Sequence, residues 1–243
     1  MSDEDTPIVI SQNTIKRLIR DVRSLQANPL TEHGIYYEHS DTDILKGQAL
    51  IIGPADTPYH DGFYLFDFDF PPDYPHRPPK VKFCTNDGVT RMNPNLYKCG
   101  KVCVSILNTW RGPAWTGCQT ISTVLLTLVS ILNSTPLLNE PGVEPDHPDT
   151  ESYQNIIRYK NFDTAILSVL ECESQRKHFS KFISNMEAHF LKNYKSITKR
   201  LNKYAKSAPT HAKSNIYVMN ILLDYQKTKK GIKNIYEKLT KLK

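Results

Sequence analysis

The 243-residue chain has no uninterrupted apolar run near the roughly 18 residues that a membrane span needs. Its first seven residues are acidic and polar. They have neither the apolar stretch of a signal peptide nor the arginine-rich pattern of a transit peptide. No internal repeat is apparent. We therefore expect a globular protein of the cytoplasm or nucleus, without a membrane partner.

Cysteine is scarce, and its five positions are Cys84, Cys99, Cys103, Cys118 and Cys172. An odd number without a secretory signal predicts reduced thiols, not a disulfide framework. No two cysteines have the C-x₂-C spacing of a zinc knuckle, so no metal site is expected. None of the eight histidines lies in a recognisable Cys–His setting, which disfavours a cysteine hydrolase.

Positive charge is scarce in the first part of the chain and abundant in the second. Residues 1–150 carry 12 Lys and Arg against 18 Asp and Glu, whereas residues 151–243 carry 19 against 7. The basic part could dock an acidic partner, and the alternative is a solvated helical face. Few aromatic residues interleave with these charges, and no nucleic-acid motif is present, so nucleic-acid binding is not predicted.

The hydrophobic pattern predicts an α+β fold that begins with a helix over Ser11–Gln26, capped by Ser11 or Asn13 and ended by Asn28-Pro29. Strand-like runs separated by short turns follow, which indicates a four-stranded antiparallel meander. The runs are Ile35–His39, Leu45–Ile52, Gly62–Phe70 and Lys80–Cys84. A helix over Thr120–Leu132 is apolar almost all round and should be central and buried. A third helix is expected over Glu151–Leu170.

The last part of the chain is expected to be helical. Phe179, Phe182, Met186 and Phe190 lie on one helical stripe, and apolar residues between positions 216 and 239 suggest one or two further helices after Pro209. The predicted organisation is a flexible N-terminus over residues 1–10, a catalytic core over 11–172, and a basic helical extension over 173–243.

The long irregular segment between residues 85 and 118 holds the most suggestive chemistry. Its stretch from Asn93 to Cys103 places a carboxamide, a glycine and a thiol in one loop. A thiolate is a strong nucleophile for acyl chemistry, and a fixed Asn amide can donate to an oxyanion. Spacing alone leaves open a buried structural cysteine beside a turn asparagine.

Several short motifs, taken in their order along residues 11–170, resemble the core of ubiquitin-conjugating (E2) enzymes. They are Gly53–Tyr59 with Gly62, Phe70–Pro75, Pro78–Val81, Asn93–Asn95, Val102-Cys103, Trp115, and Asn139–Pro141. Each motif is weak alone, and together they are specific. The Asn-Pro-Asn variant, the longer Asn108–Trp115 loop and Asn139–Gly142 are most similar to a subgroup of larger, atypical members with a C-terminal extension.

The resemblance implies the ubiquitin-conjugating fold and an acyltransferase activity. Cys103 would accept ubiquitin, or a ubiquitin-like protein, from an activating enzyme and pass it to a substrate lysine or a ligase. Asn95 matches the family's loop-supporting and oxyanion-stabilising Asn, and Glu140 falls at its acidic gate. Tyr97 and Ser105 flank the thiol. No cofactor is expected, because ATP is used by the activating enzyme.

The resemblance also implies docking surfaces for the activating enzyme and the ligase. The basic row of the first helix would contribute, together with a loop residue, and these positions are Lys16, Arg17, Arg20, Arg23 and His76. Many members have an apolar aromatic residue where this chain has His76 and a Pro-Ala pair where it has Gly117-Cys118, which puts standard ligase partnering in doubt. A catalytically silent scaffold is disfavoured because Cys103 is present. The choice between ubiquitin and a related modifier stays open.

Overall fold

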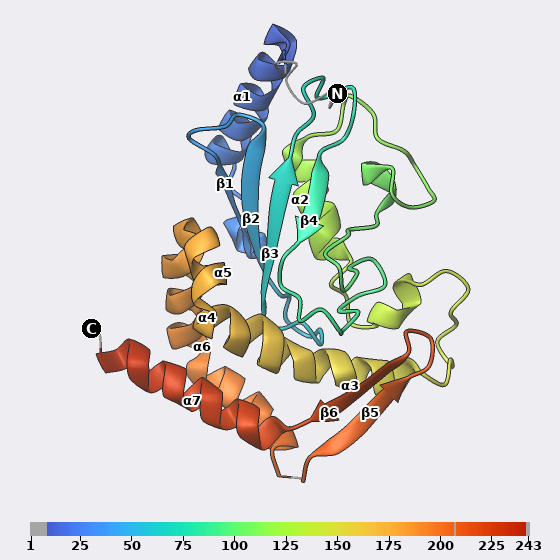
Figure 1. The fold of residues 1–243 in the computed structure, drawn as a ribbon, viewed down its shortest axis with the longest axis vertical. Helices are drawn as coiled ribbons and strands as arrows, with labels where there is room; N and C mark the ends of the chain where they lie inside the picture. The colour runs from blue at the N-terminus through green and yellow to red at the C-terminus, as the bar shows by residue number, and fades with distance from the viewer. Residues whose placement is uncertain (1–8, 207, 242–243) are drawn as a thin grey trace, which may run out of the picture.

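The computed structural model describes residues 9–206 and 208–241. Most of the N-terminal segment expected to be flexible, residues 1–8, lies outside this described part. The remainder is an α+β fold in which a four-stranded antiparallel sheet has the order β1-β2-β3-β4 (Figure 1). The strands are β1 (Ile35–His39), β2 (Lys46–Ile52), β3 (Phe63–Asp69) and β4 (Lys80–Phe83). The predicted meander is confirmed.

Helix α1 (Gln12–Ala27) begins and ends where local chemistry requires it. The Ser11 hydroxyl accepts a hydrogen bond from the Thr14 backbone N–H at 3.0 Å, which satisfies one of the free N–H groups of the first turn. The helix ends at Asn28, because the residue before a proline is disfavoured in the α conformation. Leu18 and Leu25 bury its apolar face.

Helix α2 (Ile121–Ser130) is the buried central helix that the sequence predicts. Ile121, Val124, Leu125 and Leu128 are fully shielded from solvent. Thr120 and Thr123 form a reciprocal capping box at its start. This helix therefore holds the loops on either side of it at fixed positions.

Helix α3 (Thr150–Lys160) continues through a π-helical stretch, Asn161–Ser168, into α4 (Val169–Glu171). The predicted helix is confirmed, but the widened turn was not foreseen. Asn161 lies at its start, accepts from the Tyr64 hydroxyl at 2.7 Å and donates to the His60 carbonyl at 2.9 Å. A Cβ at position 62 would lie 2.0 Å from Asn161 Oδ1, so this close approach requires Gly62.

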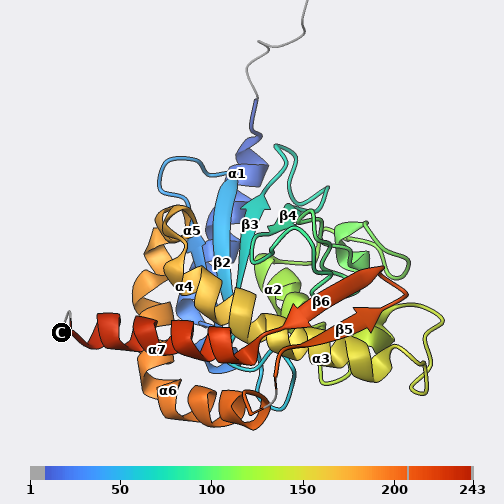
Figure 2. The same ribbon diagram turned by 60° about the horizontal axis from the view of Figure 1, so that its bottom comes forward.

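The C-terminal extension contains α5 (Glu173–His178), α6 (Ile183–Tyr204), β5 (Thr210–Ser214), β6 (Met219–Leu223) and α7 (Tyr225–Lys241). The sequence predicts only helices here, and that is wrong for residues 210–223, which form a two-stranded antiparallel hairpin. The apolar residues of this stretch are too few to distinguish a helical from a strand period. Contacts with α3 decide the outcome, and both views place the hairpin against that helix (Figure 2).

The extension shares the hydrophobic core of the preceding residues. Six of its large apolar side chains are almost fully buried in one cluster with the sheet and α2, namely Phe179, Phe182, Met186, Phe190, Ile197 and Leu201. His178 of α5 also bonds to the Asp67 carboxylate of β3 at 2.9 Å. The aromatic side chains of Phe68, Phe70 and Tyr74 lead toward α1. Asp67 and Phe68 are neighbours in β3, and neighbouring strand residues point to opposite faces of a sheet. Helix α5, which contacts Asp67, therefore covers one face of the sheet, and α1 lies on the face to which Phe68 points.

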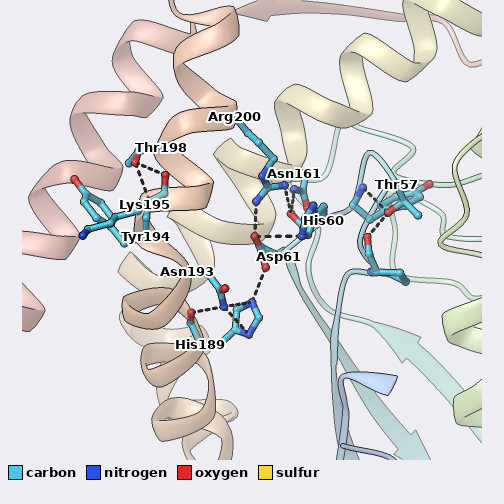
Figure 3. A network of polar contacts seen from close by, with 12 residues as sticks. Thr57, His60, Asp61, Asn161, His189, Asn193, Tyr194, Lys195, Thr198 and Arg200 are labelled. Carbon is cyan, nitrogen blue, oxygen red and sulfur yellow. Dashed lines mark hydrogen bonds and ion pairs between the residues drawn. The ribbon is translucent and has the colours of Figure 1, made fainter. Parts of the chain in front are cut away.

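A polar network also fastens α6 to the loop between β2 and β3 (Figure 3). The Asp61 carboxylate is 5% exposed and accepts hydrogen bonds from His189 Nε2, at 2.7 Å, and from the Arg200 guanidinium. Arg200 also donates to the carbonyl of His60 at 3.2 Å. The two basic residues lie on α6, so this helix is held by charge as well as by apolar packing.

No helix in residues 9–206 or 208–241 combines the length and the apolar character needed to cross a bilayer.

Candidate active site

Cys103 lies at the end of a short loop that folds back on itself. Leu96 and Val102 form an isolated antiparallel bridge, and the Cys103 backbone N–H donates to the Asn95 carbonyl at 2.9 Å. Gly100 makes the turn with φ of +89°, where a Cβ would lie 2.8 Å from the Phe83 carbonyl oxygen. Glycine is therefore required there, and the turn brings the backbone of Cys103 back beside Asn95.

Asn95 contacts Cys103 a second time, through its side chain. Its Nδ2 donates to the Cys103 carbonyl at 2.6 Å, while its Oδ1 is buried without a hydrogen-bond partner among the described residues. The amide thus braces the backbone that carries the thiol. This contact agrees with the loop-supporting role, and the oxyanion role stays a prediction.

Asn93 organises the residues around Asn95. Its Nδ2 donates to the Tyr59 hydroxyl and to the Ile131 carbonyl, both at 2.8 Å. Its Oδ1 accepts from the Asn95 backbone N–H at 2.9 Å and from Asn139 Nδ2 at 3.3 Å. The sequence analysis places Asn93 in the Asn-Pro-Asn motif and gives its side chain no partner. Its four polar contacts were missed, because three of the partners are distant in the chain.

Glu140 follows this network by one residue, at the end of the short 3₁₀ helix Pro136–Asn139. Its side chain is partly exposed, and its Oε2 accepts a hydrogen bond of 2.7 Å from the hydroxyl of Tyr217. Burial, and then the hydrogen bond to Glu140, raise the pKa of Tyr217. The phenol therefore keeps its proton and donates a hydrogen bond to the carboxylate. No sequence signal pointed to Tyr217, which lies 77 residues away.

The thiols differ in their surroundings. Cys103 is 2% exposed, and its Sγ has no hydrogen-bond partner in the described part of the chain. Burial, followed by the charge of Asp67, raises the pKa of Cys84 to about 12, and Cys99 and Cys118 are exposed. Within residues 9–206 and 208–241 no three side chains of the metal-binding types gather into a possible metal site.

Four of the five residues assigned to partner docking are exposed, and the fifth is not. Lys16, Arg20, Arg23 and His76 are exposed, but the Arg17 side chain is only 9% exposed and pairs with Asp21 at 2.8 Å. Three further contacts hold the Arg17 guanidinium in place. It donates hydrogen bonds to the carbonyls of Gly117 and Gln119, and it lies over the Tyr74 ring.

The structure therefore assigns Arg17 a bracing position that differs from the sequence interpretation. Its hydrogen bond to the Gly117 carbonyl is 2.6 Å long and ties α1 to the loop that precedes α2. Trp115 of the same loop donates to the Pro75 carbonyl at 2.7 Å, which brings His76 to this side. The basic row, His76 and Gly117 thus border one region, whose docking role stays a prediction.

Comparisons with known proteins place this geometry in context. A family model described as ubiquitin-conjugating enzyme matches residues 17–161. Ubiquitin-conjugating enzyme E2 Z of Danio rerio is 46% identical over 164 residues, 66% of this chain and 49% of that protein. The Homo sapiens E2 Z is 45% identical over 158 residues, 64% of this chain and 44% of that protein.

A plant relative extends the match into the C-terminal part. A putative ubiquitin-conjugating enzyme E2 39 of Arabidopsis thaliana is 37% identical over 207 residues, which cover 82% of this chain and 60% of that protein. The chain spans about half the length of the E2 Z relatives that it matches.

Proposed function

The chain belongs to the ubiquitin-conjugating enzyme family, and we propose that it carries ubiquitin or a ubiquitin-like protein as a thioester on Cys103. The observation that carries this proposal is the double contact between Cys103 and Asn95 inside the segment that the family model matches. A thiol on a braced loop, with a carboxamide beside it, suits acyl transfer.

The proposed reaction has two steps. The Cys103 sulfur attacks the carbonyl of the thioester that joins the modifier to the activating enzyme, and the activating enzyme's thiolate leaves. A lysine amine, or a ligase thiolate, then attacks the new thioester, and Cys103 leaves as a thiolate with the electron pair of the broken C–S bond. Asn95 would stabilise the oxyanion of each tetrahedral intermediate.

The surroundings of the thiol support a carrier more than a hydrolase. No histidine or lysine of the described residues hydrogen-bonds to Cys103, so the thiol is not part of a Cys–His or Cys–Lys pair of the kind that activates hydrolytic cysteines. The low exposure of Cys103 limits the access of water to a thioester. A thioester in such a setting would persist until an acceptor arrives.

The partners follow from the proposed reaction. An activating enzyme supplies the modifier and consumes ATP, so the chain itself needs no cofactor. A ligase and a substrate lysine receive the modifier. The exposed Lys16, Arg20 and Arg23 on α1 could attract an acidic docking surface. A cytoplasmic or nuclear location remains a prediction from the sequence.

A charging assay tests the proposal. The full chain is incubated with activating enzyme, Mg-ATP and ubiquitin, and the products are separated with and without reductant. We expect a reductant-sensitive adduct that Cys103→Ala abolishes. Cys103→Ser and Cys103→Lys should instead trap reductant-resistant conjugates, because an ester or an amide replaces the thioester.

Cys99→Ala is the matched control, since this exposed cysteine lies four residues before Cys103. It should charge like the unmodified protein, as should Cys118→Ala. The assay is repeated with other ubiquitin-like modifiers and their activating enzymes. Absence of an adduct with every modifier, from protein that is folded, would contradict the proposed function.

A further inference from the structure

The tip of the β5–β6 hairpin reaches the active-site loops, and a buried carboxylate anchors it. Asp149 is 4% exposed, and its Oδ2 accepts from the Ser214 hydroxyl at 3.0 Å and from the Ile216 backbone N–H at 2.8 Å. Burial tends to raise the pKa of Asp149, but hydrogen bonds from Ile216 and Ser214 outweigh it and lower the pKa. The carboxylate is therefore charged, and its hydrogen bonds are strengthened by that charge.

The anchored tip brings the Tyr217 side chain to Glu140. The Tyr217 hydroxyl donates to Glu140 Oε2 at 2.7 Å, and no other described side chain hydrogen-bonds to this carboxylate. The Tyr217 ring lies 5.3 Å from the ring of Tyr153 on α3. This contact restrains the ring and so gives the hydroxyl a defined direction. Because Tyr217 occupies only Oε2, Oε1 of Glu140 is available to a substrate amine.

Tyr217 also contacts the other side of the active site, through Arg91. The Arg91 guanidinium lies 5.0 Å from the Tyr217 ring centre and 3.2 Å from that of Tyr97. Its Nη2 donates to the Pro94 carbonyl at 2.6 Å, immediately before Asn95. The Arg91 backbone carbonyl accepts from the Tyr153 hydroxyl at 2.8 Å. Arg91 thus transmits the position of the hairpin tip to the Asn93–Asn95 segment.

We propose that Tyr217 is a positioning residue for the transfer step, which orients the Glu140 carboxylate toward an incoming amine and, through Arg91, steadies the segment that holds Asn95. The inference rests on the proposed function and adds that the C-terminal extension sets the rate of transfer. In that step the amine nitrogen bonds to the thioester carbonyl carbon, and the C–S bond breaks to release the Cys103 thiolate. The surplus proton of the amine passes to Glu140 and then to water.

The experiment separates charging from transfer. The full chain is charged with ubiquitin, the activating enzyme is inactivated, and the loss of thioester is followed at several concentrations of free lysine. Tyr217→Phe keeps the ring beside Arg91 and removes the hydroxyl. We expect it to slow lysine transfer about tenfold, as expected for one hydrogen bond to a charged group, while the rate of charging changes less than about twofold.

Two further variants identify the partner of Tyr217. Glu140→Gln should slow transfer at least as much as Tyr217→Phe, because it also removes the carboxylate that takes the proton. The double variant should be no slower than Glu140→Gln, because Tyr217 acts through Glu140. Tyr236→Phe is the matched control, since this extension tyrosine stacks on Tyr194 away from the active site. It should transfer at the unmodified rate.

A change of nucleophile distinguishes positioning of Glu140 from general loss of structure. Hydroxylamine is a much weaker base than a lysine amine, so it is neutral near pH 7 and its adduct loses the surplus proton to water without help from the carboxylate. Tyr217→Phe should therefore react with hydroxylamine within about twofold of the unmodified rate. Tyr217→Leu, which also removes the contact with Arg91, should be slow with both nucleophiles.

The outcomes for this inference and for the proposed function are distinct. If the unmodified chain charges and transfers, and Tyr217→Phe transfers to lysine at the same rate, Tyr217 has no positioning role. Equal slowing of Tyr217→Phe with lysine and hydroxylamine would also overturn it. If the unmodified chain does not charge on Cys103, the proposed function itself fails. Thermal unfolding of each variant identifies any that do not fold, and Tyr217→Phe alone suffices to decide.

Discussion

The side chain of Asn95 has one observed contact with the active-site loop and one proposed catalytic role. Its Nδ2 is engaged with the Cys103 carbonyl at 2.6 Å, and its Oδ1 is buried without a partner in the described residues. A side-chain amide has two N–H groups, so one can brace the loop while the other remains for an oxyanion. Hydrogen bonds at active sites also shorten or realign when substrate binds.

Replacement of Asn95 therefore has two expected effects. We expect Asn95→Ser to lower the rate of lysine transfer by on the order of 10²–10³, the range for loss of one oxyanion donor. It should also lower the free energy of unfolding by about 1–3 kcal/mol, because a buried carbonyl loses its donor. Single-turnover transfer and urea unfolding measure the two effects.

The two measurements distinguish the roles of Asn95. Transfer within about threefold of the unmodified rate, together with a clear loss of stability, would leave Asn95 with the bracing role only. Cys103 should still form the thioester because the nucleophile is unchanged, but charging should also slow if Asn95 donates to the oxyanion of that step.

At the scale of elements, helix α6 depends on charge at one point. The buried Asp61 carboxylate joins the β2–β3 loop to His189 and Arg200 (Figure 3). Burial tends to raise the pKa of Asp61, but the His189 hydrogen bond and the Arg200 charge outweigh it and lower the pKa. The helix is thus fastened best when Asp61 is ionised.

This arrangement predicts a loss of stability in acid. Because the pKa of Asp61 is lower in the folded state than in the unfolded state, its contribution is present above about pH 4 and is lost as the pH falls through the folded value. We expect Asp61→Asn to cost about 2–4 kcal/mol at neutral pH, since it leaves a partly buried Arg200 unpaired. Urea unfolding from pH 3 to pH 7 measures the cost.

The difference between Asp61→Asn and the unmodified chain should shrink below about pH 4. Asp41→Asn is the matched control, because the Asp41–Lys181 ion pair also joins the extension to the preceding residues, but Asp41 is 82% exposed. Its cost should be clearly smaller than that of Asp61→Asn, because solvent screens an exposed ion pair. A cost for Asp61→Asn that is the same at pH 3 and pH 7 would show that ionisation of Asp61 does not fasten α6.

At the scale of the whole molecule, the boundary expected near residue 172 does not coincide with a gap in packing. Six large apolar side chains beyond it lie in the same core as β3 and α2, and the His189 ring meets Phe63 at 6.0 Å. All three predicted catalytic positions nevertheless precede residue 172. The predicted catalytic residues therefore lie in the first part of the chain, whereas the hydrophobic core includes residues from both parts.

Truncation after residue 172 should consequently cost stability before it costs chemistry. Burial of each large apolar side chain contributes about 1.5–3 kcal/mol, and 1 kcal/mol corresponds to about 2–4 °C in a chain of this size. We expect residues 1–172 to unfold more than about 10 °C below the full chain, or to aggregate. Thermal unfolding and the soluble yield check this.

Soluble truncated chain should still charge on Cys103, with slower lysine transfer because Tyr217 is absent. A truncated chain with an unchanged unfolding temperature would show that the extension is an independent appendage, as the sequence alone suggests.

The sequence by itself determined the local features of the protein. Ser11 and Pro29 set the limits of α1, turn residues separate the four strands, and ordered motifs identify Cys103 and Asn95. These signals act between residues a few positions apart, where backbone preference and periodicity decide the conformation.

Tertiary structure decided the rest. Three features depend on partners more than 60 residues away in the chain. They are the hairpin over residues 210–223, the inward position of Arg17 and the contact of Tyr217 with Glu140. Such pairs are chosen by the path of the folded chain and by the cost of leaving a buried polar group without a partner. No local pattern encodes that choice, and for this reason the extension's contact with the active site became visible only in the fold.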